Sequence, residues 1–346
     1  MYIVNDKAFT SKVKALLYSA ETNNQIRFHY YDEIYSSLNW KIEPVQSLND
    51  LYLEQAKRLR EKYDYLILAY SGGYDSTNIL ETFYYNNIPL DKIIIVGAFS
   101  QDSYSGVDEN HNGELYHNAF PYVKSLGLEN ITEIHDYTKH FSNFSSFSLM
   151  QYGDDWIDHT GGWYSPHNWF WKDIERYVVP STWGTKKVGL IFGRDKPGLQ
   201  PINNKLVFSF FDTPITSYGN STGYDNCERI NFYWDPNFPD ILLKQLHVLK
   251  RVYEINSALS YDHQIHSPTI GGKDVNKLIY DLRRPLIHKS PKSPSQFLSL
   301  RDQYLKDKRT EELYKRHEAG ISKIIKTLQQ CHLNKIPPIP SRYYEI

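Results

Sequence analysis

Residues 65–76 read YLILAYSGGYDS, and they give the clearest indication of the fold class. The run at 65–70 is continuously apolar, as in a strand that is buried on both faces of a parallel sheet. A glycine-containing loop follows at 71–74. The pattern from residue 75 to 85 then predicts a helix, which ends at the Asn-Asn-Ile-Pro sequence of residues 86–89. A buried strand, a tight loop and a helix in this order predict the first half of a βαβ unit.

The alternation of strands and helices continues beyond this unit. Residues 93–99 form a second apolar run, and residues 113–126 have a helical pattern. Further strands are expected at 131–135 and 188–192, shorter ones at 206–211 and 230–234, and a helix at 167–177. This order predicts an α/β fold with a doubly wound, mainly parallel sheet and right-handed crossovers.

The chain divides by sequence character into three parts. Residues 1–45 are expected to form a small N-terminal unit, residues 46–234 the α/β domain, and residues 235–346 a mostly helical C-terminal region. Helical periods in the last part occur at 241–259, 275–282 and 311–328.

Three elements are expected before the first buried strand. Residues 8–19 have the pattern of a helix and residues 25–31 that of a strand. Residues 47–62 predict an amphipathic helix, for which Ser47 or Asn49 is the expected N-cap.

Composition excludes several classes of protein. The chain has 346 residues, of which 40% are hydrophobic and 15% aromatic, so it is not disordered overall. A formal net charge of −1 provides no general basic excess for nucleic acid, and no apolar run reaches the roughly 18 residues of a membrane span. The only cysteines are Cys227 and Cys331, too few for a disulfide framework. Residues 1–6 lack the build of a signal peptide. We therefore expect a cytoplasmic protein without a membrane partner.

The loop at 71–76 has the parts of a phosphate-binding site. Ser71 offers a hydroxyl, and Gly72 and Gly73 allow close approach of the main chain and positive φ where it is needed. The next helix directs its N–H groups and its positive dipole end at the loop. The Asp75 carboxylate would repel phosphate unless Mg²⁺ lay between them, which predicts a metal-bound nucleotide. The alternative interpretation is a chance glycine-rich turn before a helix.

The sequence SGGYDS, placed directly after an apolar strand, resembles the Ser-Gly-Gly-x-Asp-Ser signature of the PP-loop (N-type) ATP pyrophosphatases, the adenine nucleotide alpha-hydrolase superfamily. The resemblance covers about residues 45–215 and implies a HUP-like sheet with ATP and Mg²⁺ as cofactors. It also implies cleavage of ATP between the α- and β-phosphates, adenylation of an acceptor, release of pyrophosphate, and displacement of AMP by a nucleophile such as ammonia or sulfide. The implied nucleotide-binding residues are Ser71, Gly72, Gly73, Tyr74, Asp75, Ser76, Gly97, Ala98 and Phe99.

A second charged loop, GRDKP at 193–197, follows the strand expected at 188–192. If the two strands are parallel, this loop shares a sheet edge with residues 71–76. Asp195 would then complete the Mg²⁺ site with Asp75. Lys196 and Arg194 would bind the leaving pyrophosphate or stabilise the negative charge that develops in the transition state. We therefore take Lys196, Asp75 and Arg194 as candidate catalytic residues, and Asp75 and Asp195 as candidate metal ligands. The alternative is a surface turn with solvated charges.

The choice of acceptor stays open. The charged loop lies where asparagine synthetases, which the chain also resembles, carry an acidic metal-binding loop, although their Gly-Ala-Asp-Glu type of motif is absent. Residue 2 is Tyr, so the glutaminase nucleophile of those enzymes is missing. An asparagine-synthetase-like adenylation of a small carboxylate for amide formation is the first hypothesis.

Two other hypotheses are a tRNA- or nucleobase-modifying enzyme that transfers sulfur or nitrogen, and a nucleotide-binding protein without turnover. Cys227 and Cys331 are a candidate pair for sulfur transfer. One segment is rich in tryptophan, and these side chains would either pack in the core and a lid or line the binding site of the acceptor. They are Trp156, Trp163, Trp169, Trp171 and Trp183. A homo-oligomer is also compatible with the sequence.

Overall fold

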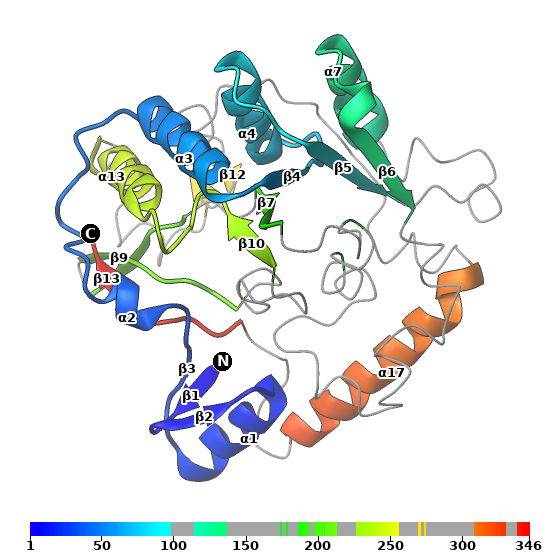
Figure 1. Cartoon of the computed structure of the whole chain (residues 1–346). Helices are drawn as coiled ribbons and strands as arrows, with labels where there is room; N and C mark the ends of the chain where they lie inside the picture. Colours follow the sequence, from blue (N-terminus) through cyan, green and yellow to red (C-terminus); the bar gives the residue numbers. More distant parts are fainter. Residues whose placement is uncertain are drawn as a thin grey trace.

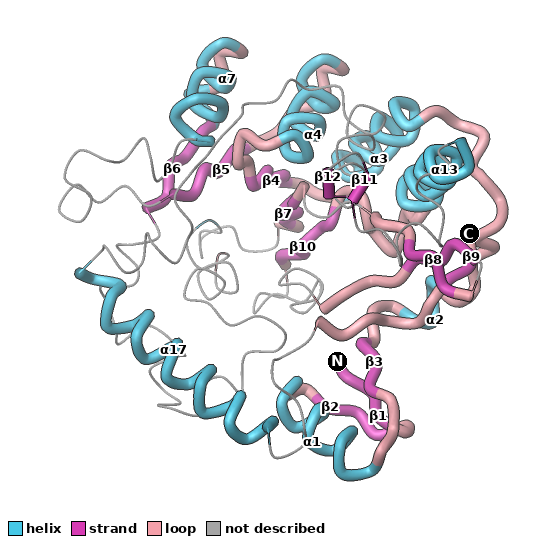
Figure 2. The backbone as a smooth tube through the Cα atoms, turned by 180° about the vertical axis from the view of Figure 1, so that it is seen from behind, coloured by secondary structure: helices cyan, strands magenta, loops and turns pink. Residues whose placement is uncertain are grey.

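The computed structural model (Figure 1) describes residues 1–97, 114–136, 174, 178, 186–193, 197–203, 205–212, 226–255, 269–270, 273–274, 308–329 and 338–346. A parallel sheet and a row of helices along one side of it form the largest part of what is described. The same arrangement is seen from behind in Figure 2.

The five-stranded sheet has the order β10-β7-β4-β5-β6, and every neighbouring pair is parallel. Its strands are β4 (Tyr65–Ala69), β5 (Lys92–Gly97), β6 (Thr132–Asp136), β7 (Val188–Phe192) and β10 (Cys227–Asn231). Four of the five residues of β4 and all five residues of β7 are buried, as continuous apolar runs predict. The predicted α/β fold with a mainly parallel sheet is confirmed.

The order of the strands reverses next to β4. The chain passes from β4 to β5 and β6 on one side, and later forms β7 and β10 on the other side. In open α/β sheets, ligands bind outside the carboxyl ends of the strands at such a reversal. The loop that follows β4 therefore lies at the favoured ligand position of this class of sheet.

Helices lie along one side of the sheet in both views (Figures 1 and 2). They are α3 (Leu48–Lys62), α4 (Tyr74–Tyr85), α7 (Phe120–Ser125) and α13 (Asp240–Ile255). A capping box starts α3, because Asp50 N donates to Ser47 Oγ at 3.2 Å and Ser47 N donates to Asp50 Oδ2 at 3.2 Å. This confirms Ser47 as the N-cap.

The N-terminal unit is an antiparallel sheet of order β2-β1-β3 with a helix packed against it. Its elements are β1 (Tyr2–Val4), β2 (Lys7–Phe9), α1 (Lys12–Thr22), β3 (Ile26–Phe28) and the short α2 (Asp32–Tyr35). The predicted start of the helix at residue 8 is wrong, because α1 begins at Lys12. Asn5 and Asp6 have positive φ values of 46° and 65°, which turn the chain into a hairpin. Ser11 then caps α1 by accepting a hydrogen bond from Lys14 N at 3.3 Å.

Residues 338–346 pair with the middle of the chain. β13 (Tyr344–Glu345) is antiparallel to β9 (Lys205–Phe208), which also pairs with β8 (Gln200–Ile202). The region 235–346 thus contains β13 and the short pair β11 (Thr269–Ile270) and β12 (Lys273–Asp274), besides α13 and α17 (Lys308–Gln329). That this region is mostly helical, and the three-part division itself, stay predictions. The helices expected at 167–177 and 275–282 lie outside the described residues, apart from residue 174.

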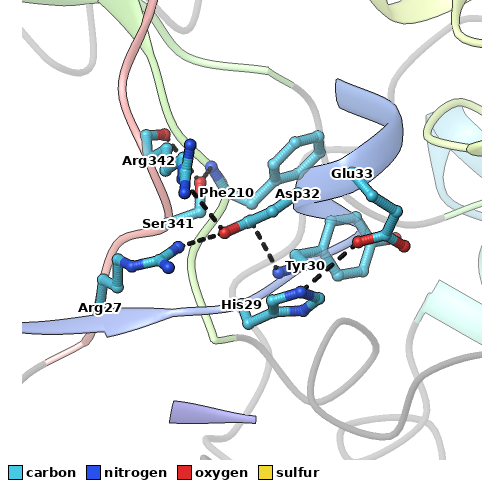
Figure 3. A network of polar contacts seen from close by, with 8 residues as sticks. All are labelled: Arg27, His29, Tyr30, Asp32, Glu33, Phe210, Ser341 and Arg342. Atoms are coloured by element: carbon cyan, nitrogen blue, oxygen red, sulfur yellow. Dashed lines mark hydrogen bonds and ion pairs between the residues drawn. The ribbon is translucent and has the colours of Figure 1, made fainter. Parts of the chain in front are cut away.

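Polar contacts around Asp32 fix residues 338–346 to the N-terminal unit (Figure 3). Asp32 Oδ2 accepts a hydrogen bond from Arg27 and lies 3.4 Å from Arg342 Nε. Tyr30 N donates to the other carboxylate oxygen at 3.3 Å. Because Asp32 is buried, these partners offset the cost of removing its charge from water.

A buried ion pair makes a second link between the same parts. Lys12 Nζ lies 2.6 Å from Asp212 Oδ2, and the two side chains are 3% and 1% exposed. Tyr2 OH donates to the same oxygen at 3.1 Å, and Ile339 N donates to Asp212 Oδ1 at 2.8 Å. Burial lowers the pKa of Lys12 and raises the pKa of Asp212, while their mutual attraction opposes both changes. The pair connects α1 with residues 205–212 and 338–346.

Candidate functional site

The loop between β4 and α4 lies at the carboxyl end of β4, as predicted, beside the point where the strand order reverses. Gly72 adopts a φ of +79°, which is costly for any residue with a side chain. A Cβ atom on Gly72 would also lie 2.7 Å from Ala119 N. Residue 72 must therefore be glycine for two independent reasons. Gly73 has an ordinary φ of −77° and is the N-cap of α4.

Two serine hydroxyls hold the loop in shape. Ser71 Oγ and Ser76 Oγ are 3.2 Å apart, and Ser71 N donates to Ser76 Oγ at 3.3 Å. Gly73 N donates to Ser71 Oγ at 3.2 Å, and Ser76 Oγ donates to Gly73 O at 3.2 Å. The Ser71 hydroxyl, which was predicted to contact a phosphate, thus accepts a hydrogen bond from the main chain of its own loop. A phosphate at Gly73 N would compete with Ser71 for that donor.

The first turn of α4 carries the candidate acid. Asp75 is half-buried, and its main-chain oxygen accepts a hydrogen bond from Tyr233 OH at 2.8 Å. Asn78 Nδ2 in turn donates to Tyr233 OH at 3.0 Å. Burial raises the pKa of Tyr233 and of Tyr52, and the Asp75 carboxylate adds to both increases. Asp75 therefore lies close to this pair of tyrosines, whose ring centroids are 5.6 Å apart. Tyr74, which opens the helix, is half-buried.

The end of β7 contacts the start of α4. A Cβ atom on Gly193 would lie 2.9 Å from Ser76 N and 3.0 Å from the carbonyl carbon of Asp75. Because β4 and β7 are parallel neighbours, Gly193 and the loop after β4 lie at the same edge of the sheet.

Several predicted site residues, including three of the second loop, are not among the described residues. Arg194, Asp195 and Lys196 lie outside the described residues, as do Ala98, Phe99, Cys331, Trp156, Trp163, Trp169, Trp171 and Trp183. Gly97 is buried at the end of β5, where it pairs with Asp136 of β6. Cys227 is buried in β10.

A glutamate carboxylate lies beside the loop in the described part of the chain. A Cβ atom on Gly73 would lie 2.9 Å from Glu114 Oε1. Burial raises the pKa of Tyr70 to about 12, and the charges of Glu81 and Glu114 contribute to the increase. Within the described residues, no group of three or more His, Cys, Asp or Glu side chains is placed to hold a metal ion.

Comparison with protein-family models, with curated proteins and with solved structures finds no match for this chain. No helix of the described part has the length and apolar character needed to cross a membrane.

Sequence reasoning missed Glu114 and Tyr233. Glu114 immediately precedes the π-helical turn η1 (Leu115–Ala119), near the start of the helical pattern at 113–126. A helix that follows a strand of a parallel sheet begins near the carboxyl edge of the sheet, so an acidic residue at the start of that pattern is a candidate for the site. Tyr233 reaches Asp75 from beyond β10, and that contact depends on the strand order.

Proposed function

We propose that the chain binds ATP with Mg²⁺ at residues 71–76 and activates an acceptor as its adenylate, with release of pyrophosphate. The observation that carries the proposal is the SGGYDS turn, which lies at the carboxyl end of β4 and at the reversal of strand order. The strand order also supports assigning the sheet to the HUP-like class. Action in the cytoplasm stays a prediction.

The residues present fit a nucleotide in three respects. The N-terminus of α4 supplies the positive end of a helix dipole, which favours phosphate. Gly73 carries no side chain and can bring its main chain close to an anion. The Asp75 carboxylate would hold Mg²⁺, which neutralises phosphate charge when it is bound. The charged loop after Gly193 starts against the same helix turn, which supports a role for Arg194, Asp195 and Lys196 in holding pyrophosphate.

An acceptor carboxylate is the first candidate substrate, as in asparagine-synthetase-like amide formation. In that reaction a carboxylate oxygen bonds to the α-phosphorus of ATP while the bond from this phosphorus to the pyrophosphate oxygen breaks. AMP then leaves when ammonia or an amine attacks the acyl carbon. A panel of small carboxylates and amines, assayed for AMP and pyrophosphate, tests this proposal. AMP and pyrophosphate should form in equal amounts and only when an acceptor is present. Saturable ATP binding without AMP in any mixture would favour a binding protein without turnover.

Replacement of Asp75 by Asn is expected to lower ATP-dependent pyrophosphate release by about 10- to 100-fold, because a metal-holding carboxylate is lost. Asp64→Asn is the matched control: this exposed carboxylate lies just before β4, at the opposite edge of the sheet, where it accepts a hydrogen bond from Lys187 N at 2.8 Å. Turnover at the wild-type rate in Asp75→Asn would rule out the assignment of Asp75.

A further inference from the structure

The Glu114 carboxylate lies against the glycine loop. A Cβ atom on Gly73 would be 2.9 Å from Glu114 Oε1, 3.7 Å from Glu114 Cδ and 3.2 Å from Ser71 Oγ. The glutamate therefore occupies space beside Gly73 and near the Ser71 hydroxyl. This is the space that a phosphate oxygen would enter to reach the main chain of the loop.

The backbone around Glu114 explains how it reaches this place. The turn η1 is a π-helix, in which Phe120 N donates to Leu115 O. Its last residue, Ala119, packs against Gly72. One turn thus contacts both glycines of the loop, through Glu114 at one end and Ala119 at the other. Single π-helical turns are frequent at functional sites.

The charge of Glu114 acts on the loop region. After burial and the charge of Glu81, it is a further cause of the raised pKa of Tyr70, the residue that precedes Ser71. A negative charge in this position opposes a phosphate that arrives without a cation. Two like charges a few ångströms apart repel even in water, and they repel more strongly near a protein surface.

We propose that Glu114 makes the loop select the cation-complexed form of a nucleoside triphosphate over the free form. The carboxylate lowers the affinity for metal-free phosphates by repulsion, and a divalent cation bound to the triphosphate removes most of that penalty. The inference rests on the proposed function of the loop, and it adds a residue that determines which form of the nucleotide binds.

The test is equilibrium binding of ATP to the full chain by calorimetry, with excess Mg²⁺ and with a chelator. In the chelator, Glu114→Gln is expected to bind ATP about 3- to 10-fold more tightly than the wild type. With Mg²⁺ the difference should be small, so the dependence of affinity on Mg²⁺ falls by nearly the same factor. Glu129→Gln makes the same charge change at the opposite sheet edge, just before β6, and should behave as the wild type.

Three outcomes would overturn the inference. The Mg²⁺ dependence of Glu114→Gln could equal that of the wild type, its binding could weaken under both conditions, or neither protein could bind ATP in the chelator. In each case, wild-type binding with Mg²⁺ leaves the proposed function intact. Absence of saturable wild-type binding under both conditions removes the proposed function as well. Glu114→Ala should change the affinity in the same direction, and circular dichroism checks that both variants fold.

Discussion

Gly72→Ala is expected to destabilise the protein by about 2–5 kcal/mol and to abolish ATP binding at the loop. An alanine at a left-handed φ costs about 1–2 kcal/mol, and forcing an extra methyl group into a packed contact costs about 1–3 kcal/mol more. The methyl group would meet Ala119 N at 2.7 Å, and a main-chain atom cannot rotate away as a side chain can. Urea denaturation measures the loss of stability.

Gly127→Ala is the matched control. Gly127 has a φ of +67°, close to that of Gly72, but an added Cβ would meet nothing within 4 Å. It should therefore cost only the backbone term of about 1–2 kcal/mol and leave ATP binding unchanged. Equal losses of stability in the two variants would show that η1 does not pack against the loop as described.

Lys12→Met is expected to cost about 3–5 kcal/mol of unfolding free energy, because it leaves the buried Asp212 charge without its cation. The double variant Lys12→Met/Asp212→Asn removes both charges and should recover much of that loss. Lys62→Met breaks the exposed pair with Glu228 and should cost no more than about 1 kcal/mol. If Lys12→Met costs no more than Lys62→Met, the buried pair does not hold the N-terminal unit in place.

The same variant has a pH dependence with a defined sign. Burial already raises the pKa of Asp212, and loss of Lys12 removes the attraction that opposes this increase. A carboxyl group with a pKa above its unfolded value destabilises the fold increasingly as pH rises, because the unfolded state ionises more readily. The penalty of Lys12→Met should therefore be smaller at about pH 5 than at about pH 8. Denaturation at both pH values checks the sign.

The buried strands and the loop were predictable from local sequence. β7 has the predicted bounds, Val188–Phe192, and α4 begins one residue before the predicted start. These elements have continuous apolar runs or strong helical periods, so local pattern and tertiary burial agree. The strand expected at 230–234 is instead Cys227–Asn231. Phe232, Tyr233 and Trp234 are buried, but they follow the strand, and an apolar pattern does not separate a buried turn from a strand.

The pairing of segments that are far apart in the chain could not be predicted from the local sequence pattern. β13 has two residues, and it pairs with a strand more than 130 positions earlier, so no local period signals it. The contact of Glu114 with Gly73 likewise depends on how η1 packs against the loop. The local sequence was enough to predict the loop that forms the main-chain part of the candidate site. The position of the Glu114 side chain beside that loop could be found only from the three-dimensional structure.

The most direct test of phosphate binding by residues 71–76 is a titration of the isotope-labelled full chain with ATP and Mg²⁺, followed through assigned backbone amide resonances. The Gly72 and Gly73 amides should show the largest changes and saturate with the ATP concentration. Excess pyrophosphate should reverse their shifts. Saturable ATP binding that leaves both amides at their ligand-free positions would contradict the assignment of this loop.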